Sequence, residues 1–292
     1  MLNESFFQHL QYEKRFSAHT LTAYKSDLQA FSEYIHTQFE VDDLTQVPHT
    51  FIRSWIVQLM DGGLKSKSIN RKISTLKSYY KFLQREGEII QSPMLKVISP
   101  KVPKRLPQFV EERGMERLLE QQDFENTFEG IRNRLIMELF YATGIRVSEL
   151  INLKASDVNI SGMQIKVLGK RNKERIIPIS EHLLPLMNLY LDEKSHSIGN
   201  NEFYFCSVKG GPLYTKYVYR LVKSELSKVT TIQKKSPHIL RHTFATHMLN
   251  NGADLNAIKE ILGHSSLAAT QVYTHNSIEK LKNIYKQAHP KS

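Results

Sequence analysis

The sequence has 292 residues, enough for two ordinary domains, and its 40% hydrophobic and 24% charged residues are typical of a soluble globular protein. Its 40 lysines and arginines exceed its 29 acidic residues, and the formal net charge of +11 favours a polyanionic partner. The single Cys206 excludes an intramolecular disulfide and any multi-cysteine metal site. No stretch approaches the roughly 18 apolar residues of a membrane span, so we expect a cytoplasmic protein that makes no membrane contact.

The first third of the chain is predicted to be helical. After a polar start at Ser17, apolar residues recur at helical spacing from Leu21 to Ile35, which is typical of an amphipathic helix. A second apolar stripe covers residues 51–59, and a third helix is expected from Ser68 onward.

Basic residues gather on this third helix, and no acidic residue interrupts them. A solvated helix face is the ordinary alternative, but such faces mix both signs of charge, so we expect contacts with a phosphate backbone. The candidate residues for these contacts are Lys65, Lys67, Arg71, Lys72, Lys77, Lys81 and Arg85.

Prolines and basic residues alternate between Ser92 and Pro107, which predicts an extended basic linker. We therefore expect a domain at residues 1–98, a linker at 99–107 and a second domain at 108–292. Two domains joined in this way could close around a duplex, with the linker residues Lys101, Lys104 and Arg105 on its phosphates.

The second domain is expected to be mostly helical with one hairpin. Helices are predicted over residues 114–119 and 131–141, the latter ending at Gly144. Alternating apolar residues at 163–167 and 175–179 predict two strands joined by a basic turn that carries Lys170, Arg171 and Lys173. The fold class is therefore mainly α, with a small antiparallel sheet.

Residues 236–275 hold the most informative spacing. His238 and Arg241 lie three apart, so on a helix both can face one anion. Asp254 is expected to cap a helix that ends at Gly263. A further short helix after His264 is expected to carry Tyr273.

Four separated motifs carry a resemblance to a known family. They are Ala142-Thr143-Gly144-Ile145-Arg146-Val147-Ser148-Glu149-Leu150, His238-x-x-Arg241, Leu262-Gly263-His264 and Tyr273-Thr274-His275. Together they resemble the tyrosine site-specific recombinases of the phage integrase family, closest to the bacterial Xer type that resolves chromosome dimers. The resemblance implies a SAM-like, four-helix core-binding domain followed by a catalytic domain.

The resemblance implies a phosphate clamp made by two arginines. Arg146 alone would more often be a surface residue, but the family places a phosphate-binding arginine there and a second one at Arg241. Glu149 would orient Arg146. Lys170, in the predicted hairpin turn, would be the general acid for the departing 5′ oxygen.

The resemblance assigns the nucleophile to Tyr273. Attack on a DNA phosphate would give a 3′-phosphotyrosyl link, and strand exchange would proceed through a Holliday junction. His238 would transfer a proton or contact the phosphate, and His264 would hydrogen-bond to it. Tyr285 is the rival nucleophile within the chain, and His247 is expected to be structural.

Neither a metal constellation nor a Walker loop stands out, so we expect an enzyme that needs no metal and no ATP. Alternatives are an integrase or transposase of a mobile element, a type IB topoisomerase and a noncatalytic DNA-binding regulator. Expected partners are duplex DNA and a homo- or hetero-tetramer on it, with a second Xer-type recombinase or a septal DNA translocase as further candidates. The C-terminal helix at residues 277–288 would dock on its own protomer or on the next.

Overall fold

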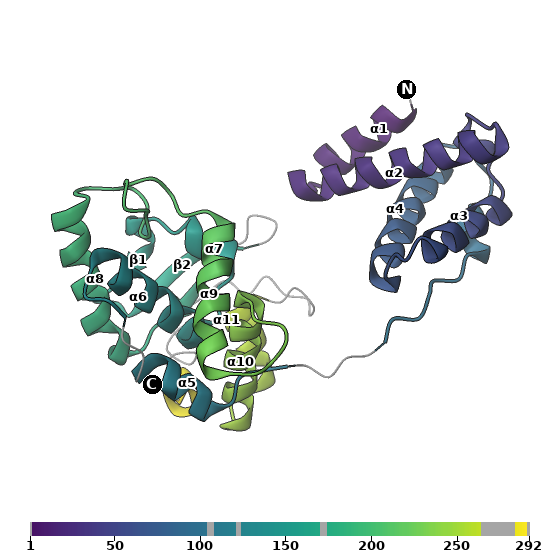
Figure 1. The fold of residues 1–292 in the computed structure, drawn as a ribbon. Helices are drawn as coiled ribbons and strands as arrows, with labels where there is room; N and C mark the ends of the chain where they lie inside the picture. Colours follow the sequence, from purple (N-terminus) through teal and green to yellow (C-terminus); the bar gives the residue numbers. More distant parts are fainter. Residues whose placement is uncertain (1, 104–107, 121–123, 170–173, 264–283, 291–292) are drawn as a thin grey trace. The chain divides into compact units, whose positions relative to one another are not determined.

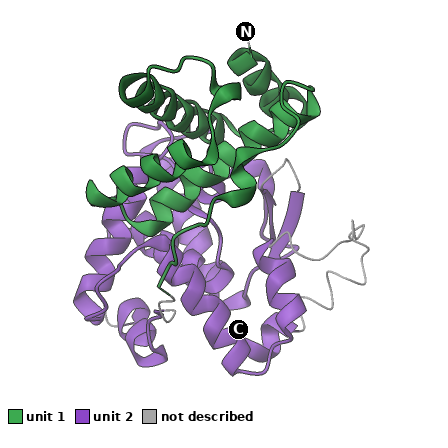
Figure 2. Ribbon diagram, turned by 90° about the vertical axis from the view of Figure 1, so that its right-hand side faces the viewer, with its two compact units in different colours: residues 1–105 green, residues 106–292 purple. Residues whose placement is uncertain are grey.

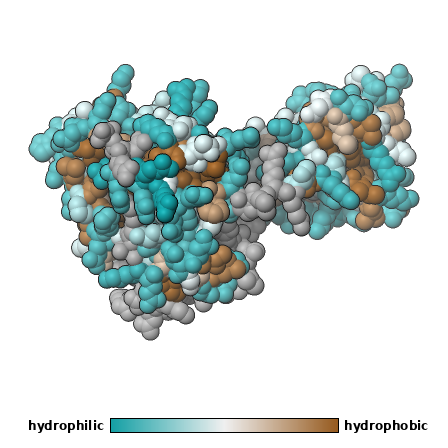
Figure 3. Space-filling model, turned by 60° about the horizontal axis from the view of Figure 1, so that its bottom comes forward, coloured by the Kyte–Doolittle hydropathy of each residue, from teal (hydrophilic) through white to brown (hydrophobic). Residues whose placement is uncertain are grey.

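The structure is a computed structural model, and it describes residues 2–103, 108–120, 124–169, 174–263 and 284–290. The chain divides into two compact units, residues 1–105 and 106–292 (Figure 2). Hydrophilic side chains cover most of the face of each unit drawn in Figure 3, and apolar side chains show there as separate patches. None of the described helices is both long and apolar enough to cross a membrane.

The first unit is entirely helical in its described part (Figure 1). Its α-helices are α1 (Leu2–Gln8), α2 (Ala18–Phe39), α3 (His49–Asp61) and α4 (Ser66–Arg85), and its short helical turns are η1 (His9–Glu13), η2 (Leu44–Gln46) and η3 (Pro93–Lys96). Ser17 caps α2, as its sequence predicts, because its hydroxyl accepts a hydrogen bond from the Thr20 amide at 3.3 Å. The helix α4 begins before the expected start, since the Lys65 carbonyl already accepts hydrogen bonds from the Ser68 and Ile69 amides.

The apolar faces of α2, α3 and α4 enclose the core of the first unit. Phe31 of α2 packs on Trp55 of α3, with ring centroids 4.9 Å apart, and Leu76 of α4 is fully buried in the same cluster. Because the apolar residues of α4 turn inward, its basic residues are carried on the remaining part of the helix surface.

The second unit combines helices with a small sheet. Its helices are α5 (Glu112–Glu120), α6 (Phe128–Thr143), α7 (Val147–Ile151), α8 (Leu184–Ser197), α9 (Thr215–Val229), α10 (Pro237–Asn250) and α11 (Leu255–Leu262), with the short turns η4 (Ala155–Asp157) and η6 (Glu181–Leu183). The buried helix α6 packs against α8 and α10. The residues 284–288 at the end of the chain are also helical.

The sheet has three antiparallel strands in the order β1 (Val158–Asn159), β2 (Gln164–Leu168) and β3 (Glu174–Pro178). In β2 and β3, Ile165 pairs with Ile177, and Val167 pairs with Arg175. The predicted hairpin strands are confirmed, while the two-residue β1 was not predicted because so short a strand has no alternation to detect. The mainly α fold class with a small antiparallel sheet is confirmed.

Candidate active site

A tight turn after α6 places Arg146 at the start of α7. The helix α6 ends at Gly144, whose φ of 58° is in the left-handed region. A Cβ at this position would lie 2.7 Å from side-chain atoms of Leu262 and Phe244, so the turn can pack closely only with glycine. Arg146 then begins α7, and its amide donates a hydrogen bond to Glu149 at 2.9 Å.

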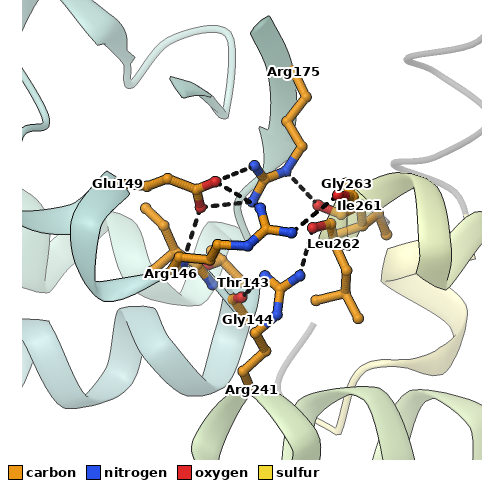
Figure 4. A network of polar contacts seen from close by, with 10 residues as sticks. Thr143, Gly144, Arg146, Glu149, Arg175, Arg241, Ile261, Leu262 and Gly263 are labelled. Carbon is orange, nitrogen blue, oxygen red and sulfur yellow. Dashed lines mark hydrogen bonds and ion pairs between the residues drawn. The ribbon is translucent and has the colours of Figure 1, made fainter. Parts of the chain in front are cut away.

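Glu149 is the centre of a buried polar network (Figure 4). Its carboxylate accepts hydrogen bonds from the Arg146 amide, from Arg146 Nη1 at 2.8 Å and from both Nη atoms of Arg175. Four donors fill the acceptor capacity of a carboxylate. Burial by itself raises the pKa of Glu149, but the hydrogen bonds and charge of Arg175, together with Arg146, outweigh it and hold the pKa below its ordinary value.

Three arginines meet at the C-terminal end of α11. Arg175 Nε donates to the Ile261 carbonyl at 2.8 Å, Arg241 Nη2 donates to the Leu262 carbonyl, and Arg146 Nη2 donates to the Gly263 carbonyl at 2.9 Å. The terminal carbonyls of a helix have no partner within the helix and form its negative end, which favours cations. Asp254 caps the other end of α11, and Gly263 ends it with φ of 64°, as the sequence predicts.

Arg241 is buried on α10, and its second Nη atom donates to the Gly144 carbonyl. Burial lowers the pKa of Arg241 to about 9, with the positive charges of Arg146 and Arg175 adding to the effect. Arg146 and Arg175 pair with Glu149, while Arg241 bonds only to backbone carbonyls, so the three guanidinium groups and the one carboxylate carry an excess of two positive charges. A bound anion would relieve this repulsion, and a phosphate offers oxygens that match the guanidinium fork.

His238 lies in the first turn of the same helix, three residues before Arg241, and is exposed. Partial desolvation lowers the pKa of His238, and the cations Lys234, Arg241 and Arg146 lower it further. The imidazole is therefore neutral at pH 7 and can accept a proton.

The structure thus brings together four of the residues that the sequence singles out: Arg146, Glu149, His238 and Arg241. Lys170, His264 and Tyr273 lie outside the described residues, as do Lys104, Arg105, Arg171 and Lys173. Among the described residues, no group of three or more His, Cys, Asp or Glu side chains is placed to hold a metal ion.

Comparisons with known proteins agree with this geometry. The phage integrase family matches residues 108–280, and the N-terminal SAM-like domain of phage integrases matches residues 4–87. The tyrosine recombinase XerC of Staphylococcus epidermidis is 38% identical over 295 residues, covering 100% of this chain and 98% of the relative. The chain belongs to the phage integrase family. It is a tyrosine-type site-specific DNA recombinase.

One further relative supports the same assignment, and a solved structure shares the fold. The tyrosine recombinase XerC of Chlorobaculum parvum is 37% identical to the recombinase over 314 residues, covering 98% of this chain and 94% of the relative. A solved structure of the XerH site-specific recombinase bound to palindromic difH substrate has the same fold, with a TM-score of 0.70 and 23% identity over 92% of this chain and 76% of that chain.

Sequence reasoning missed Arg175 as a site residue of the recombinase. The sequence held the signal, because residues two apart on a strand lie on the same face. Arg175 therefore shares the buried face of the predicted strand with Ile177 and Ile179. A buried arginine in a strand needs an acidic partner, and that partner is Glu149.

Tyr285 is poorly suited to be the nucleophile of the recombinase. It is fully packed in the core of the second unit, its hydroxyl has no hydrogen-bond partner among the described residues, and burial raises its pKa. The nearby His247 is also buried and shares a hydrogen bond with the Tyr141 hydroxyl at 2.9 Å, which fits the structural role expected for it.

The basic residues of α4 and of its N-cap fall into two groups, those without an ion pair and those with one. Lys65, Lys67, Lys77 and Lys81 are exposed, and none of them forms an ion pair within the described part of the chain. Arg85 is exposed too, but it pairs with Glu13 and Glu86. The linker residue Lys101 is also exposed.

Lys72 departs from the expectation that all seven cations face DNA. Its side chain is only 13% exposed, and its ammonium donates to the buried carboxylate of Asp27 at 3.0 Å. Arg71 pairs with the same carboxylate but keeps 47% of its side-chain surface exposed. Lys72 is therefore a counterion inside the first unit, because a carboxylate buried at that depth needs a charged partner.

A second basic stripe, also missed by sequence reasoning, lies on α9. Lys216, Arg220 and Lys223 recur at helical spacing, are all exposed, and form no ion pair with any described residue. The opposite side of the helix buries Val218 and Val222 in the core. The spacing of the three cations along 216–223 was the signal that could have identified this surface.

Proposed function

We propose that this recombinase exchanges DNA strands through a covalent 3′-phosphotyrosyl link at Tyr273. The observation that carries the proposal is the convergence of Arg146 and Arg241 on the C-terminal end of α11, one residue before His264 in the sequence. Two guanidinium groups with an excess of positive charge suit a DNA phosphate whose nonbridging oxygens gain charge during the reaction.

In the proposed cleavage step, the Tyr273 oxygen attacks the phosphorus and the bond from phosphorus to the 5′ oxygen breaks. Neutral His238 accepts the tyrosine proton, and Lys170 gives a proton to the departing 5′ oxygen. Arg146 and Arg241 neutralise the nonbridging oxygens, and His264 hydrogen-bonds to one of them. The link retains the energy of the phosphodiester, so the 5′ hydroxyl of another strand can attack it and reverse the chemistry on a new partner.

We assign the exposed cations of both units to the DNA backbone. In the first unit, phosphates would be contacted by Lys65, which caps α4, and by Lys67, Lys77 and Lys81 within it. In the second unit they would be contacted by Lys216, Arg220 and Lys223 on α9. These surfaces, with the linker cations Lys101, Lys104 and Arg105, support duplex DNA as the partner.

For the biological role we infer the resolution of chromosome dimers at cell division, by a tetramer assembled on DNA. Similarity over the full chain to XerC tyrosine recombinases supports this role over integration of a mobile element. Deletion of the gene should leave cells with unresolved dimers at division. Normal segregation in the deleted strain would refute the role but not the chemistry.

The chemistry is tested with a nicked duplex that carries the chromosomal recombination site, because loss of the short fragment traps the covalent intermediate. The wild type and Tyr285→Phe should both yield a protein-linked strand on a denaturing gel, with or without EDTA. Tyr273→Phe should bind the duplex and yield none. A linked strand with Tyr273→Phe would refute the assignment of the nucleophile.

A further inference from the structure

Arg175 is enclosed by the protein on every side. Its side chain extends from β3 toward α7 and α11, and the residue is 3% exposed (Figure 4). All three guanidinium nitrogens are engaged: Nε with the Ile261 carbonyl, and both Nη atoms with Glu149. Two of its five N–H groups have no hydrogen-bond partner among the described residues, but at 3% exposure Arg175 offers a DNA phosphate no open surface, so it is not placed to bind DNA directly.

We propose that Arg175 is a positioning residue of the phosphate clamp, which fixes Glu149 and the end of α11 and thereby sets the places of Arg146 and Arg241. The inference rests on the proposed function, because it assigns Arg175 a role in a clamp for the scissile phosphate. Two independent contacts of Arg175 support it.

The first contact acts through Glu149. Arg146 and Arg175 bind the same carboxylate, and Arg175 takes one hydrogen bond to each of its oxygens. Without Arg175, Arg146 would be the only guanidinium on Glu149, and the carboxylate would neutralise the charge that the phosphate needs. Arg175 thus supplies the counterion for Glu149, so that Glu149 can orient Arg146 without cancelling it.

The second contact acts through α11. The carbonyls of Ile261, Leu262 and Gly263 follow one another, and each accepts a hydrogen bond from a different arginine. Because consecutive carbonyls of one helical turn move together, the bond from Arg175 to Ile261 also fixes the two carbonyls that hold Arg241 and Arg146.

Gly263 offers a way to disturb Arg175 without changing any charge. A Cβ at residue 263 would lie 3.0 Å from Arg175 Cδ and 3.2 Å from its Nε, so alanine there should shift the arginine by a few tenths of an ångström. Gly252 is the matched control, since it also has positive φ, but its Cβ would meet nothing within 4 Å. Both substitutions cost similar backbone strain, and only one of them reaches Arg175.

The test is a double-mutant cycle with Arg175→Met, Glu149→Gln and the double variant. Each protein is measured for covalent complex formation on the nicked duplex at saturating enzyme, for affinity to the same duplex, and for unfolding without DNA. We expect Arg175→Met to lower the cleavage rate on the order of 100-fold, the cost of a small misplacement, with affinity at the wild-type level. The double variant should be no slower than the slower single variant.

Conservative and steric variants complete the test. Arg175→Lys keeps the charge but loses the three-point contact, so it should also be slow, and Gly263→Ala should be slower than Gly252→Ala. Wild-type cleavage by Arg175→Lys, equal rates for the two glycine variants, or additive effects in the cycle would each overturn the proposal. If the wild type forms no covalent complex, the proposed function fails instead, and the unfolding cycle still decides whether Arg175 and Glu149 act as one unit.

Discussion

Replacing Arg241 with methionine should abolish most of the cleavage and leave the fold nearly as stable as before. The guanidinium is buried between the Gly144 and Leu262 carbonyls and beside two other arginines. Its pKa of about 9 lies more than three pH units below the ordinary arginine value, so burial and the two neighbouring arginines together destabilise the charged form by roughly 5 kcal/mol. Two hydrogen bonds from a charged donor stabilise the fold by about 3–6 kcal/mol, so this stabilisation nearly cancels the destabilisation of the buried charge.

The reaction, in contrast, depends on that charge. Removing one preorganised donor from a site that stabilises developing negative charge costs about 100- to 1,000-fold in rate, and Arg241 supplies a whole guanidinium. The assay pairs thermal unfolding with single-turnover cleavage of the nicked duplex. Arg134→Met is the control, because Arg134 is an exposed arginine of the same unit that pairs with Glu138.

Two results would contradict this reasoning about Arg241. A fall of more than about 10 °C in the unfolding temperature would mean that the carbonyl contacts outweigh the desolvation, and that Arg241 is chiefly structural. Cleavage within about tenfold of the wild type would mean that Arg241 does not bind the reacting phosphate.

Four other substitutions have distinct expected outcomes. Glu149→Gln should lose about 3–5 kcal/mol of stability at pH 7, because it removes the carboxylate that pairs with the buried Arg175 and the partly buried Arg146. Because the folded-state pKa of Glu149 is lowered, the wild type should lose this stability only as the pH falls below about 4.3, and urea unfolding of the variant should lack that dependence. Lys72→Met should destabilise the first unit without changing the salt dependence of DNA binding. Lys77→Met should instead reduce the slope of log affinity against log salt by about 0.9. Equal slopes for the two variants would contradict the assignment of Lys72 to the protein interior and of Lys77 to the DNA backbone. In the wild type, the cleavage rate should rise with pH through a pKa below the ordinary histidine value of about 6.5. His238→Gln should remove this acid limb of the pH–rate profile. An unchanged acid limb would exclude His238 as the proton acceptor.

Local signals allowed much of the site to be predicted from the sequence. Gly144 and Gly263 end their helices in the left-handed conformation, and Asp254 caps α11, as their positions in the sequence indicate. The helix ends at Gly144 and Gly263 position Arg146 and the terminal carbonyls of α11. His238 and Arg241, three residues apart, lie on one helix, as their spacing predicts. Each of these features depends on a few neighbouring residues, which is why the sequence reveals it.

Contacts between distant elements could not be predicted in the same way. The alternation of β3 shows that Arg175 faces inward, but its partner Glu149 lies 26 residues earlier on another element. Likewise, nothing in the basic run of α4 distinguishes Lys72 from its neighbours, because the distinguishing Asp27 lies 45 residues earlier on α2. The packing of helices and strands decides which cations are used inside the protein, and local spacing does not record that packing.

Mapping the peptide that carries the DNA decides whether Tyr273 becomes linked to the 3′ end of the cleaved strand. Trypsin should release Tyr273 within residues 260–280 and Tyr285 within residues 283–286, so mass spectrometry of the digested covalent complex separates the two tyrosines. We expect a 3′-phosphonucleotide adduct on the 260–280 peptide alone. An adduct on the 283–286 peptide, or a link to the 5′ end of the DNA, would contradict it.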